Sequence, residues 1–215
     1  MVAAPAPLAP SGPASAAKDE GLRERKKRAT RRALRLAGLE LVAERGLDAV
    51  TTEEIAAAAG VSPRTFFNYF TGKEDALVGN DPELLPRLLA GLAARPVDEP
   101  VLDSLRAVFV AYADDVVVDR DLWRLRMRVV EQNPSLRAAM LGATAELERR
   151  LAAAVAERLG MDPTEHPYPR LAANLAVAAA RASLLHVGTG RPGRELAEVL
   201  AESFDAIAAG LPAPG

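Results

Sequence analysis

The feature of this sequence that most constrains its fold is a dense series of helix-starting and helix-breaking residues between positions 51 and 70. Thr51 is followed three residues later by Glu54, which is the spacing of a capping box, where each side chain accepts from a backbone amide of the other residue. This pattern predicts a short helix that begins at Thr52 and ends near Gly60, a residue type that favours helix ends.

A second short helix is predicted directly after the first. Ser62 can accept from the backbone amides of a following helix, and Pro63, at the first helical position, has no amide to leave unpaired. This helix is expected to run to about Phe70 and to end before Thr71 and Gly72. Two short helices joined by a glycine-containing turn have the spacing of a helix-turn-helix that reads DNA.

The positions of the aromatic residues assign two faces to this second helix. Phe66 and Phe70 are four residues apart, so they share one face, which is expected to pack on Ile55. The remaining residues are expected on the outer surface: Arg64, Thr65, Phe67, Asn68 and Tyr69. Aromatic rings are costly to leave in water, and a DNA backbone and groove would cover them. A helical hairpin inside an ordinary protein core is the alternative.

The composition favours an all-α protein. Hydrophobic residues make up 49% of the chain, and Ala and Leu dominate them over the β-branched and aromatic residues that favour strands. The chain has no cysteine and two histidines, which excludes disulfides, thiolate metal sites and a histidine-rich metal centre. With no secretory signal pattern and no charge-free apolar run of membrane-spanning length, we expect a soluble cytoplasmic protein without cofactors or metals.

Positive charge is concentrated near the N-terminus, although the whole chain has a formal net charge of −2. Residues 23–35 contain eight basic residues and a single acidic one, Glu24. Such a run is often only a solvated face. Beside a helix-turn-helix, it is expected to be a flexible arm that adds salt-dependent affinity for DNA.

Three segments are predicted along the chain. Residues 1–22, rich in Ala, Pro, Gly and Ser, are expected to be a disordered extension. Residues 23–80 are expected to form the DNA-binding domain, beginning with an amphipathic helix over 26–45. Residues 81–211 are expected to form a second helical domain, with helices over 101–117, 119–132, 134–159, 169–187 and 194–209.

From about Thr30 to Leu77 the sequence resembles the TetR family of bacterial regulators. The segments that carry the resemblance are RRALRLAGLELVAERGLDAVT, TEEIAAAAGVS, RTFFNYF and GKEDAL, in the order of the family. The resemblance implies an all-α regulator with a helix-turn-helix domain and a helical effector-binding and dimerisation domain. It also implies a homodimer that binds a palindromic operator in double-stranded DNA, usually as a repressor, and responds to a small molecule.

The resemblance further implies roles for individual residues. Thr65, Tyr69 and Lys73 would contact DNA phosphates, which position a protein without specifying sequence. Arg64 and Asn68 would reach base edges, since their side chains match the hydrogen-bonding groups of guanine and adenine.

Phe67 stands where many members of the family have tyrosine. Its ring cannot donate the phenol hydrogen bond to a phosphate, so an apolar contact, for example with a thymine methyl group, is expected instead. Thr51 would serve the site only indirectly, as the cap of the first motif helix.

The stretch from Arg120 to Gly160 resembles a subgroup of actinobacterial regulators related to the mycofactocin regulator, which implies a small apolar or acyl-CoA-like effector. An apolar pocket is expected among these helices, and its candidate lining residues are Phe109, Tyr112, Trp123, Met127 and Met140. The same spacing of large apolar residues is typical of a plain core. Candidates for contact with an anionic ligand are Arg124, Arg126 and Arg128, with a solvated face as the alternative.

The last two helices carry stripes of small and apolar residues, namely Ala172, Leu175, Ala179 and Ala182, then Leu196, Val199, Leu200, Phe204 and Ile207. In the TetR family the corresponding helices form a four-helix dimer interface. A twofold dimer would present two reading helices to a palindromic operator. Packing within the core of a single chain is the alternative.

Two sequence patterns are similar to motifs found in enzymes, and each departs from its motif. The segment Gly188–Gly193 reads G-x-G-x-x-G, but a dinucleotide site needs a preceding strand, and an Ala-rich helix is predicted there. Asp114, Asp115 and Asp119 resemble the aspartates that hold magnesium in helical prenyl-transferring enzymes, but the spacing is one residue longer and no second acidic cluster faces them. A magnesium-dependent helical enzyme and a DNA-coating protein without sequence preference are the alternatives to a ligand-responsive repressor.

Overall fold

The computed structural model describes residues 13–78, 81–113, 119–190 and 193–213, with side chains from Arg25 onward. The described chain contains helices and loops and no strand, which confirms the all-α class. The helices are α1 (Pro13–Arg45), α2 (Thr52–Ala58), α3 (Pro63–Phe67), α4 (Lys73–Val78), α5 (Leu84–Ala93), α6 (Val101–Ala113), α7 (Arg120–Gln132), α8 (Pro134–Leu159), α9 (Tyr168–Thr189) and α10 (Leu196–Ala208).

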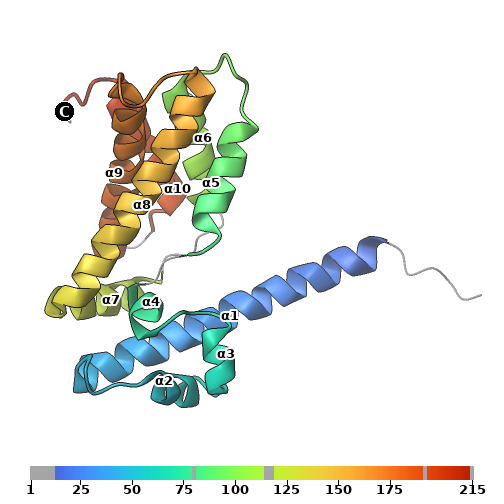
Figure 1. The fold of residues 1–215 in the computed structure, drawn as a ribbon, viewed down its shortest axis with the longest axis vertical. Coiled ribbons are helices and arrows are strands. Elements are labelled where there is room, and N and C mark those ends of the chain that lie inside the picture. The colour runs from blue at the N-terminus through green and yellow to red at the C-terminus, as the bar shows by residue number, and fades with distance from the viewer. Residues whose placement is uncertain (1–12, 79–80, 114–118, 191–192, 214–215) are drawn as a thin grey trace, which may run out of the picture.

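The helices form two groups that meet at α7 (Figure 1). Helices α5, α6, α8, α9 and α10 stand side by side as an upright bundle, and α1 to α4 lie beneath them. We call α1 to α4 the head. Because α7 lies between the two groups, it is placed to transmit a change in one to the other.

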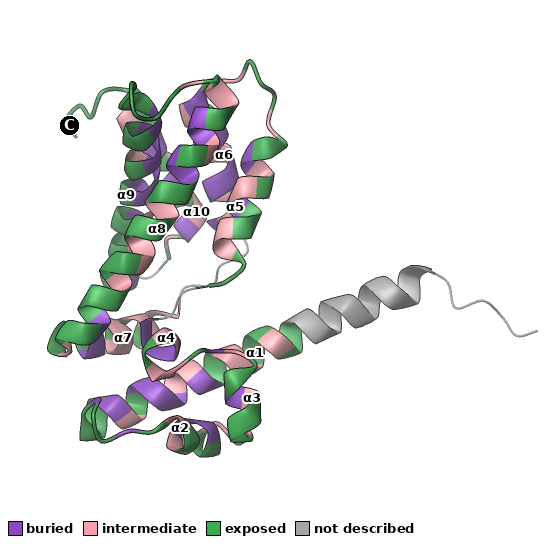
Figure 2. Ribbon diagram, in the orientation of Figure 1, coloured by how far each residue is buried: buried purple, intermediate pink, exposed green. Residues whose placement is uncertain are grey.

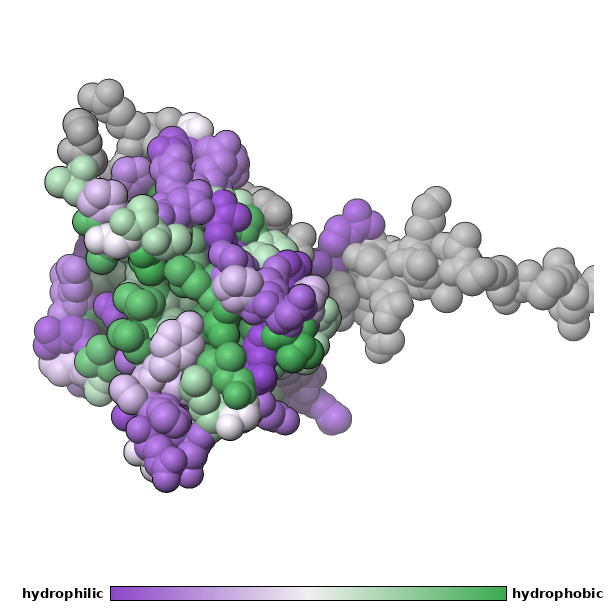
Figure 3. Space-filling model, turned by 90° about the horizontal axis from the view of Figure 1, so that it is seen from above, coloured by the Kyte–Doolittle hydropathy of each residue, from purple (hydrophilic) through white to green (hydrophobic). Residues whose placement is uncertain are grey.

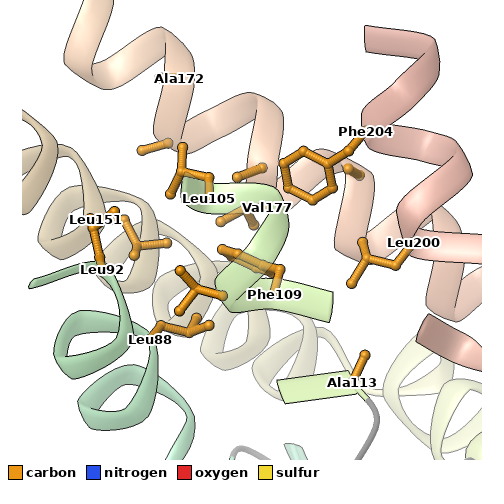
Figure 4. Packing of buried hydrophobic residues seen from close by; sticks show 14 of the residues in the cluster. Leu88, Leu92, Leu105, Phe109, Ala113, Leu151, Ala172, Val177, Leu200 and Phe204 are labelled. Atoms are coloured by element: carbon orange, nitrogen blue, oxygen red, sulfur yellow. The ribbon is translucent and has the colours of Figure 1, made fainter. Parts of the chain in front are cut away.

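Each group has its own apolar core, and the buried surfaces face inward (Figure 2). In the bundle, Phe109 of α6 packs against Phe204 of α10 with 6.0 Å between ring centroids. Leucine and valine side chains of the other bundle helices surround this pair (Figure 4). In the head, Phe66, Phe70 and Ile55 occupy the centre. Burial of apolar side chains provides most of the free energy that holds helices together.

The core of the head includes residues from beyond the predicted domain boundary. Val129 and Val130 of α7 and Leu136 of α8 are buried in the same cluster as Leu34 of α1. The domain boundary between residues 80 and 81 therefore remains a prediction. Residues from both sides of that boundary pack in the core of the head. The sequence predicted a helix over 119–132, but it did not show which helices the apolar side chains of α7 would pack against.

Helix α1 begins earlier than the sequence predicted. It starts at Pro13, whereas residues up to 22 were expected to be disordered and the first helix to begin at about Lys26. Proline suits the first position of a helix, and the Ala, Lys, Glu and Arg residues that follow have high helix propensity. The end of the helix agrees with the prediction, since Gly46 follows Arg45 with φ of 84°. Residues 1–12 lie outside the described residues.

The bundle helices lie close to their predicted ranges. Helix α8 has the predicted bounds, and α7 begins at Arg120 because Asp119 caps it by accepting from the amide of Leu122 at 3.1 Å. Residues 114–117, predicted as the end of the helix that starts at Val101, lie outside the described residues. Among the described helices, α9 alone is long and apolar enough to cross a membrane, and 44% of that window is buried inside the protein. The core helix of a soluble protein has these same properties.

The end of the bundle furthest from α2 and α3 carries exposed apolar side chains. Figure 3 looks onto this end and shows apolar residues gathered across the middle, with hydrophilic residues around them. Three large apolar residues beyond or at the ends of the bundle helices are exposed, namely Val97 between α5 and α6, Tyr168 at the start of α9 and Leu211 after α10. The predicted DNA-binding residues lie at the opposite end of the molecule.

Leu136→Ala tests the shared core. Leu136 is fully buried, so its truncation is expected to lower the free energy of unfolding by about 2–5 kcal/mol, as measured by urea denaturation. Leu141→Ala, on the same helix at a residue that is 62% exposed, is the control and is expected to change that energy by less than about 0.5 kcal/mol. Equal effects of the two changes would contradict this packing.

Candidate functional site

The predicted caps of the helix-turn-helix are present. The hydroxyl of Thr51 accepts from the amide of Glu54 at 3.2 Å, and the carboxylate of Glu54 accepts from the amide of Thr51 at 2.9 Å. Ser62 caps α3 by accepting from the amide of Thr65 at 3.1 Å. Gly60, in the turn, has φ of 70°, which glycine adopts at little cost. These local interactions fix where α2 ends and α3 begins.

The two faces predicted around α3 are present in part, since Thr65 and Tyr69, expected on the outer surface, are half-buried and Tyr69 packs against the core of the head. Phe66 and Phe70 are buried, with 5.7 Å between ring centroids, and they hold α3 against the core of the head. On the other side Arg64 and Asn68 are exposed, and Phe67 is 54% exposed. A large apolar ring left in water beside polar side chains is typical of a surface that a partner covers.

Two other residues predicted to contact DNA are less exposed than Arg64 and Asn68. Thr65 and Tyr69 are half-buried, and the Thr65 hydroxyl lies 2.8 Å from the Ser62 hydroxyl, with which it shares a hydrogen bond. Helix α3 ends at Phe67, with Asn68 as its C-cap, rather than near Phe70. Asn68 and Tyr69 therefore lie on the turn that follows the helix.

Lys73 makes contacts that the sequence did not predict. Its ammonium group donates to the carbonyl oxygens of Leu47 at 2.8 Å and Val50 at 3.0 Å. These carbonyls belong to the loop between α1 and α2, so Lys73 holds that loop against α4. Two of its three protons are used within the protein, and the phosphate contact implied by the family resemblance stays a prediction. The loop carbonyls could not have been identified from sequence spacing.

The basic run is helical, where a flexible arm was expected. Arg25, Lys26 and Arg28 are exposed on α1. The later basic residues take part in packing, since Arg32 pairs with Asp119 and the Lys27 ammonium lies 3.7 Å from the Glu83 carboxylate. Only the first part of the described run is therefore available to attract DNA phosphates.

The structure does not bring the five candidate pocket residues together. Phe109 is buried in the bundle core, whereas Met140 packs against the core of the head. Tyr112 is half-buried and donates its hydroxyl proton to Asp81. Trp123 and Met127, in contrast, lie side by side in an open groove between α7 and α9 with a volume of about 350 Å³.

This groove has an apolar floor and charged edges. Its lining residues are Trp123, Arg124, Met127, Arg128 and Glu131 from α7, and Leu185 and Thr189 from α9. Arg124 is exposed and lies 3.6 Å from Asp121, and Arg128 is exposed. The volume is at the lower end of the range for pockets that hold small ligands. The groove is therefore the candidate effector site within the described part of the chain.

The glycine-rich motif at the end of α9 positions one wall of this groove. A side chain at Gly188 would begin 2.5 Å from the ring of Trp123, so only glycine lets the ring pack against the helix. Arg120 donates to the carbonyl of Gly190 at 2.8 Å. These two contacts join α7 to α9. The G-x-G-x-x-G pattern follows a helix, as predicted, and lacks the strand that a dinucleotide site needs.

Of the acidic residues of the magnesium alternative, the structure describes Asp119. Asp119 caps α7 and pairs with Arg32. The amide of Leu122, together with the charge of Arg32, holds the pKa of Asp119 below its usual value. Asp114 and Asp115 lie outside the described residues. In the described ranges no group of three potential metal ligands occurs.

One face of α9 carries apolar residues that the bundle leaves exposed. Leu171, Leu175, Ala178, Ala182 and Leu185 follow one another at alternating steps of four and three residues, the spacing of a helix-pairing seam. All five are exposed except Leu175, which is half-buried. We call these residues the α9 stripe.

The α9 stripe corrects part of the predicted interface. Ala172 and Ala179 are buried in the core of their own chain, and so are Leu196, Val199, Leu200 and Phe204 of α10. Of the predicted α9 residues, Leu175 and Ala182 belong to the stripe. The prediction combined two faces of the helix, because a sequence stripe does not show which neighbour covers it.

Comparison with known proteins identifies relatives of both parts of the chain. Residues 34–78 match the family model described as bacterial regulatory proteins, tetR family, and residues 99–212 match the model of the MftR C-terminal domain. The HTH-type transcriptional regulator TcmR of Streptomyces glaucescens is 37% identical over 75% of this chain and 71% of its own length. MftR of Mycobacterium tuberculosis, described as a mycofactocin biosynthesis transcriptional regulator, is 30% identical over 80% of this chain and 86% of its own.

Solved structures with the same fold include two repressors. FadR of Thermus thermophilus, a TetR family repressor in complex with lauroyl-CoA, has a TM-score of 0.52 at 28% identity and covers 86% of this chain and 99% of its own. SmeT of Stenotrophomonas maltophilia, the repressor of a multidrug efflux pump, has a TM-score of 0.50 at 20% identity, covering 88% and 98%. At that identity SmeT supports the fold alone.

Lys73→Met tests the role of the Lys73 ammonium group. Because two carbonyls lose their donor, the free energy of unfolding is expected to fall by about 1–3 kcal/mol, whereas Lys26→Met, at an exposed lysine of α1, leaves it unchanged. An unchanged free energy of unfolding would contradict the role of Lys73 in holding the loop. A phosphate contact made by the third proton would appear separately, as a fall of about 1 in the slope of log affinity for DNA against log salt.

Proposed function

Since the chain belongs to the TetR family of bacterial transcriptional regulators, we propose that it is a cytoplasmic repressor that leaves a palindromic operator when a small effector binds. The family and both relatives are regulators and not enzymes, so the magnesium-dependent enzyme is set aside. The observation that carries the proposal is the pair of faces on α3, one fixed in the core through Phe66 and one exposed with Arg64 and Phe67, followed by the exposed Asn68 at the end of the helix.

The exposed face of α3 has the chemistry of a base-reading surface. The guanidinium group of Arg64 can donate two parallel hydrogen bonds to guanine, and the amide of Asn68 can both donate to and accept from adenine. Phe67 would contact a thymine methyl group. Thr65 and Tyr69 would position the head through phosphate oxygens. Because the caps and the buried phenylalanines fix the backbone of α3, these side chains are held ready before DNA binds.

We propose that the α9 stripe is the dimer interface. Helices of two chains related by a twofold axis can bury this seam against each other, which removes exposed leucines from water. Leu171 is 56% exposed in the single chain, so burial there provides a clear gain. The pairing would also place two reading helices in a fixed relation, and a palindromic operator presents its half-sites with the same symmetry.

We propose that the groove between α7 and α9 is the effector site. The apolar floor suits an acyl chain, and the arginines at its edges suit an anionic group on the same molecule. FadR of Thermus thermophilus, which binds lauroyl-CoA, supports a ligand of this class. Because α7 carries Val129 and Val130 into the core of the head, a ligand that moves α7 would change the position of α3.

The function is tested by selecting genomic fragments that the protein retains at physiological salt. A single palindromic sequence is expected among them, and lauroyl-CoA is expected to release it. The Arg64→Ala variant is expected to bind that palindromic sequence about tenfold to a hundredfold more weakly than the wild type, because one base contact is lost. It is also expected to show a weaker preference at one base position of each half-site. Binding would be measured by fluorescence anisotropy.

Arg28→Ala is the control, since Arg28 is an exposed basic residue of α1. Its loss is expected to weaken operator and random DNA alike. If Arg64→Ala also weakened both to the same extent, Arg64 would not be a base reader. Retention of fragments without any shared sequence would favour a DNA-coating protein.

Leu171→Glu tests the dimer. A charge within an apolar seam is costly to bury, so the variant is expected to sediment as a monomer and to bind the operator at least about tenfold more weakly. Val97→Glu, at a residue that is 81% exposed and lies outside the α9 stripe, is expected to remain a dimer. Analytical ultracentrifugation distinguishes the two states. If the Leu171→Glu variant sedimented as a dimer, the α9 stripe would not be the dimer interface.

A further inference from the structure

The groove between α7 and α9 shares one wall with the α9 stripe. Two residues of α9 line the groove, Leu185 and Thr189. Leu185 is the last residue of the α9 stripe, and Thr189 is exposed four residues further on, at the next position of the same alternating spacing. A helix that packs along the stripe would therefore reach the open side of the groove.

The two sides of the α9 stripe differ. On one side α9 meets α7, where Gly188 packs against an aromatic ring of α7, and Arg181, seven residues earlier, is exposed on the same side. On the other side α9 meets α10, where the hydroxyl oxygens of Ser183 and Ser203 lie 3.0 Å apart. His186, three residues after Ser183, is exposed on this second side. The groove therefore lies on the α7 side of the stripe, and His186 lies on the α10 side.

A second copy that covers the stripe would be related to the first by a twofold axis along the bundle. The head lies at one end of the bundle (Figure 1), so an axis in this direction places both heads at the same end, where one DNA duplex can meet them. The two α9 helices then run parallel, and each side of one stripe is turned toward the opposite side of the other. The groove of each chain therefore faces the α10 side of its partner.

The charges of α9 and α10 suit this pairing. Helix α9 contains Arg170 and Arg181 and no carboxylate, whereas α10 contains Glu198, Glu202 and Asp205 and no basic residue. All five side chains are exposed, and the carboxylates also pair with arginines of their own chain that lie outside α10. Because Arg181 lies on the α7 side, it would face the acidic α10 of the partner, and opposite charges across an interface favour the correct partner. A second copy of this chain is therefore the occupant that fits the stripe.

We propose that the groove is one part of a site that the second copy completes, with His186 of the partner subunit over its open side. This inference rests on the proposed dimer interface and effector groove. Trp123 and Met127 provide an apolar floor in one chain, and the second chain adds the wall that a pocket needs to exclude water from an acyl chain. The imidazole of the partner's His186 can donate an N–H to an anionic group that Arg128 also meets. Ligand binding and dimerisation then strengthen each other.

Quenching of Trp123 fluorescence by acrylamide tests this arrangement without a ligand. Trp123 is the only tryptophan of the chain and lines the groove, so its emission reports on the groove. Leu171→Glu supplies the monomer, and Leu171 lies fourteen residues before Leu185, about 21 Å along α9, so it does not touch the groove. The groove of the monomer lacks its cover, and the quenching constant is expected to be about twice that of the wild-type dimer. Circular dichroism checks that both proteins are equally helical.

Binding of lauroyl-CoA, measured through the same fluorescence, provides the second arm. The Leu171→Glu monomer is expected to bind it at least about tenfold more weakly than the wild type, although every groove residue of the chain is retained. His186→Ala is expected to remain a dimer and to bind lauroyl-CoA about tenfold more weakly, because a hydrogen bond to a charged group is lost. Asn174→Ala, at an exposed residue of α9 that does not line the groove, is expected to keep both dimerisation and affinity.

The proposal is overturned if Leu171→Glu is a monomer in which Trp123 is quenched no more than in the wild type, or if that monomer binds lauroyl-CoA with the affinity of the wild type. Either result would leave the proposed dimer interface intact. If Leu171→Glu remains a dimer, the proposed interface fails and the shared site fails with it. A wild type that does not bind lauroyl-CoA contradicts the proposed effector class, and the quenching measurement then decides whether the groove is shared.

Discussion

The structure depends on one shared core, in which α7 and the start of α8 are buried together with the head. Val129, Val130 and Leu136 have no exposed apolar surface of consequence and lie in one cluster with Phe66 and Ile55. Close packing transmits displacement, because a tightly filled core cannot deform continuously. A regulator needs such a connection between its ligand and its DNA, and α7 joins the proposed effector groove to the head.

The head presents α3 through interactions that are local and through contacts that are not. The caps at Thr51 and Ser62 define the helix ends within a few residues of sequence. Lys73 then fixes the loop between α1 and α2 from a position more than twenty residues away. The caps hold the ends of α2 and α3, and Lys73 holds the loop before α2, so Arg64 is exposed on a rigid support, which is what specific recognition of a base requires.

On its other side α7 rests on α9, and this contact depends on the absence of a side chain. Gly188 allows the Trp123 ring to lie against the helix, and the groove opens beside that ring. The α9 stripe lies on the same helix, and its last residue, Leu185, also lines the groove. The proposed DNA-binding surface lies on the head, and the proposed effector groove and dimer interface lie on α7 and α9, which pack against each other. A movement of α7 would therefore affect all three proposed surfaces.

Sequence alone determined the all-α class, the helix-turn-helix with its caps, the outward set around Arg64 and Phe67, and the family. These are consequences of short-range rules, since capping and helical periodicity act over three to eight residues. Tertiary structure decided which apolar stripe faces which neighbour, that Phe109 and Met140 belong to different cores, and that Lys73 binds carbonyls. Periodicity shows that a face must be buried but does not specify its partner, because apolar attraction is not directional.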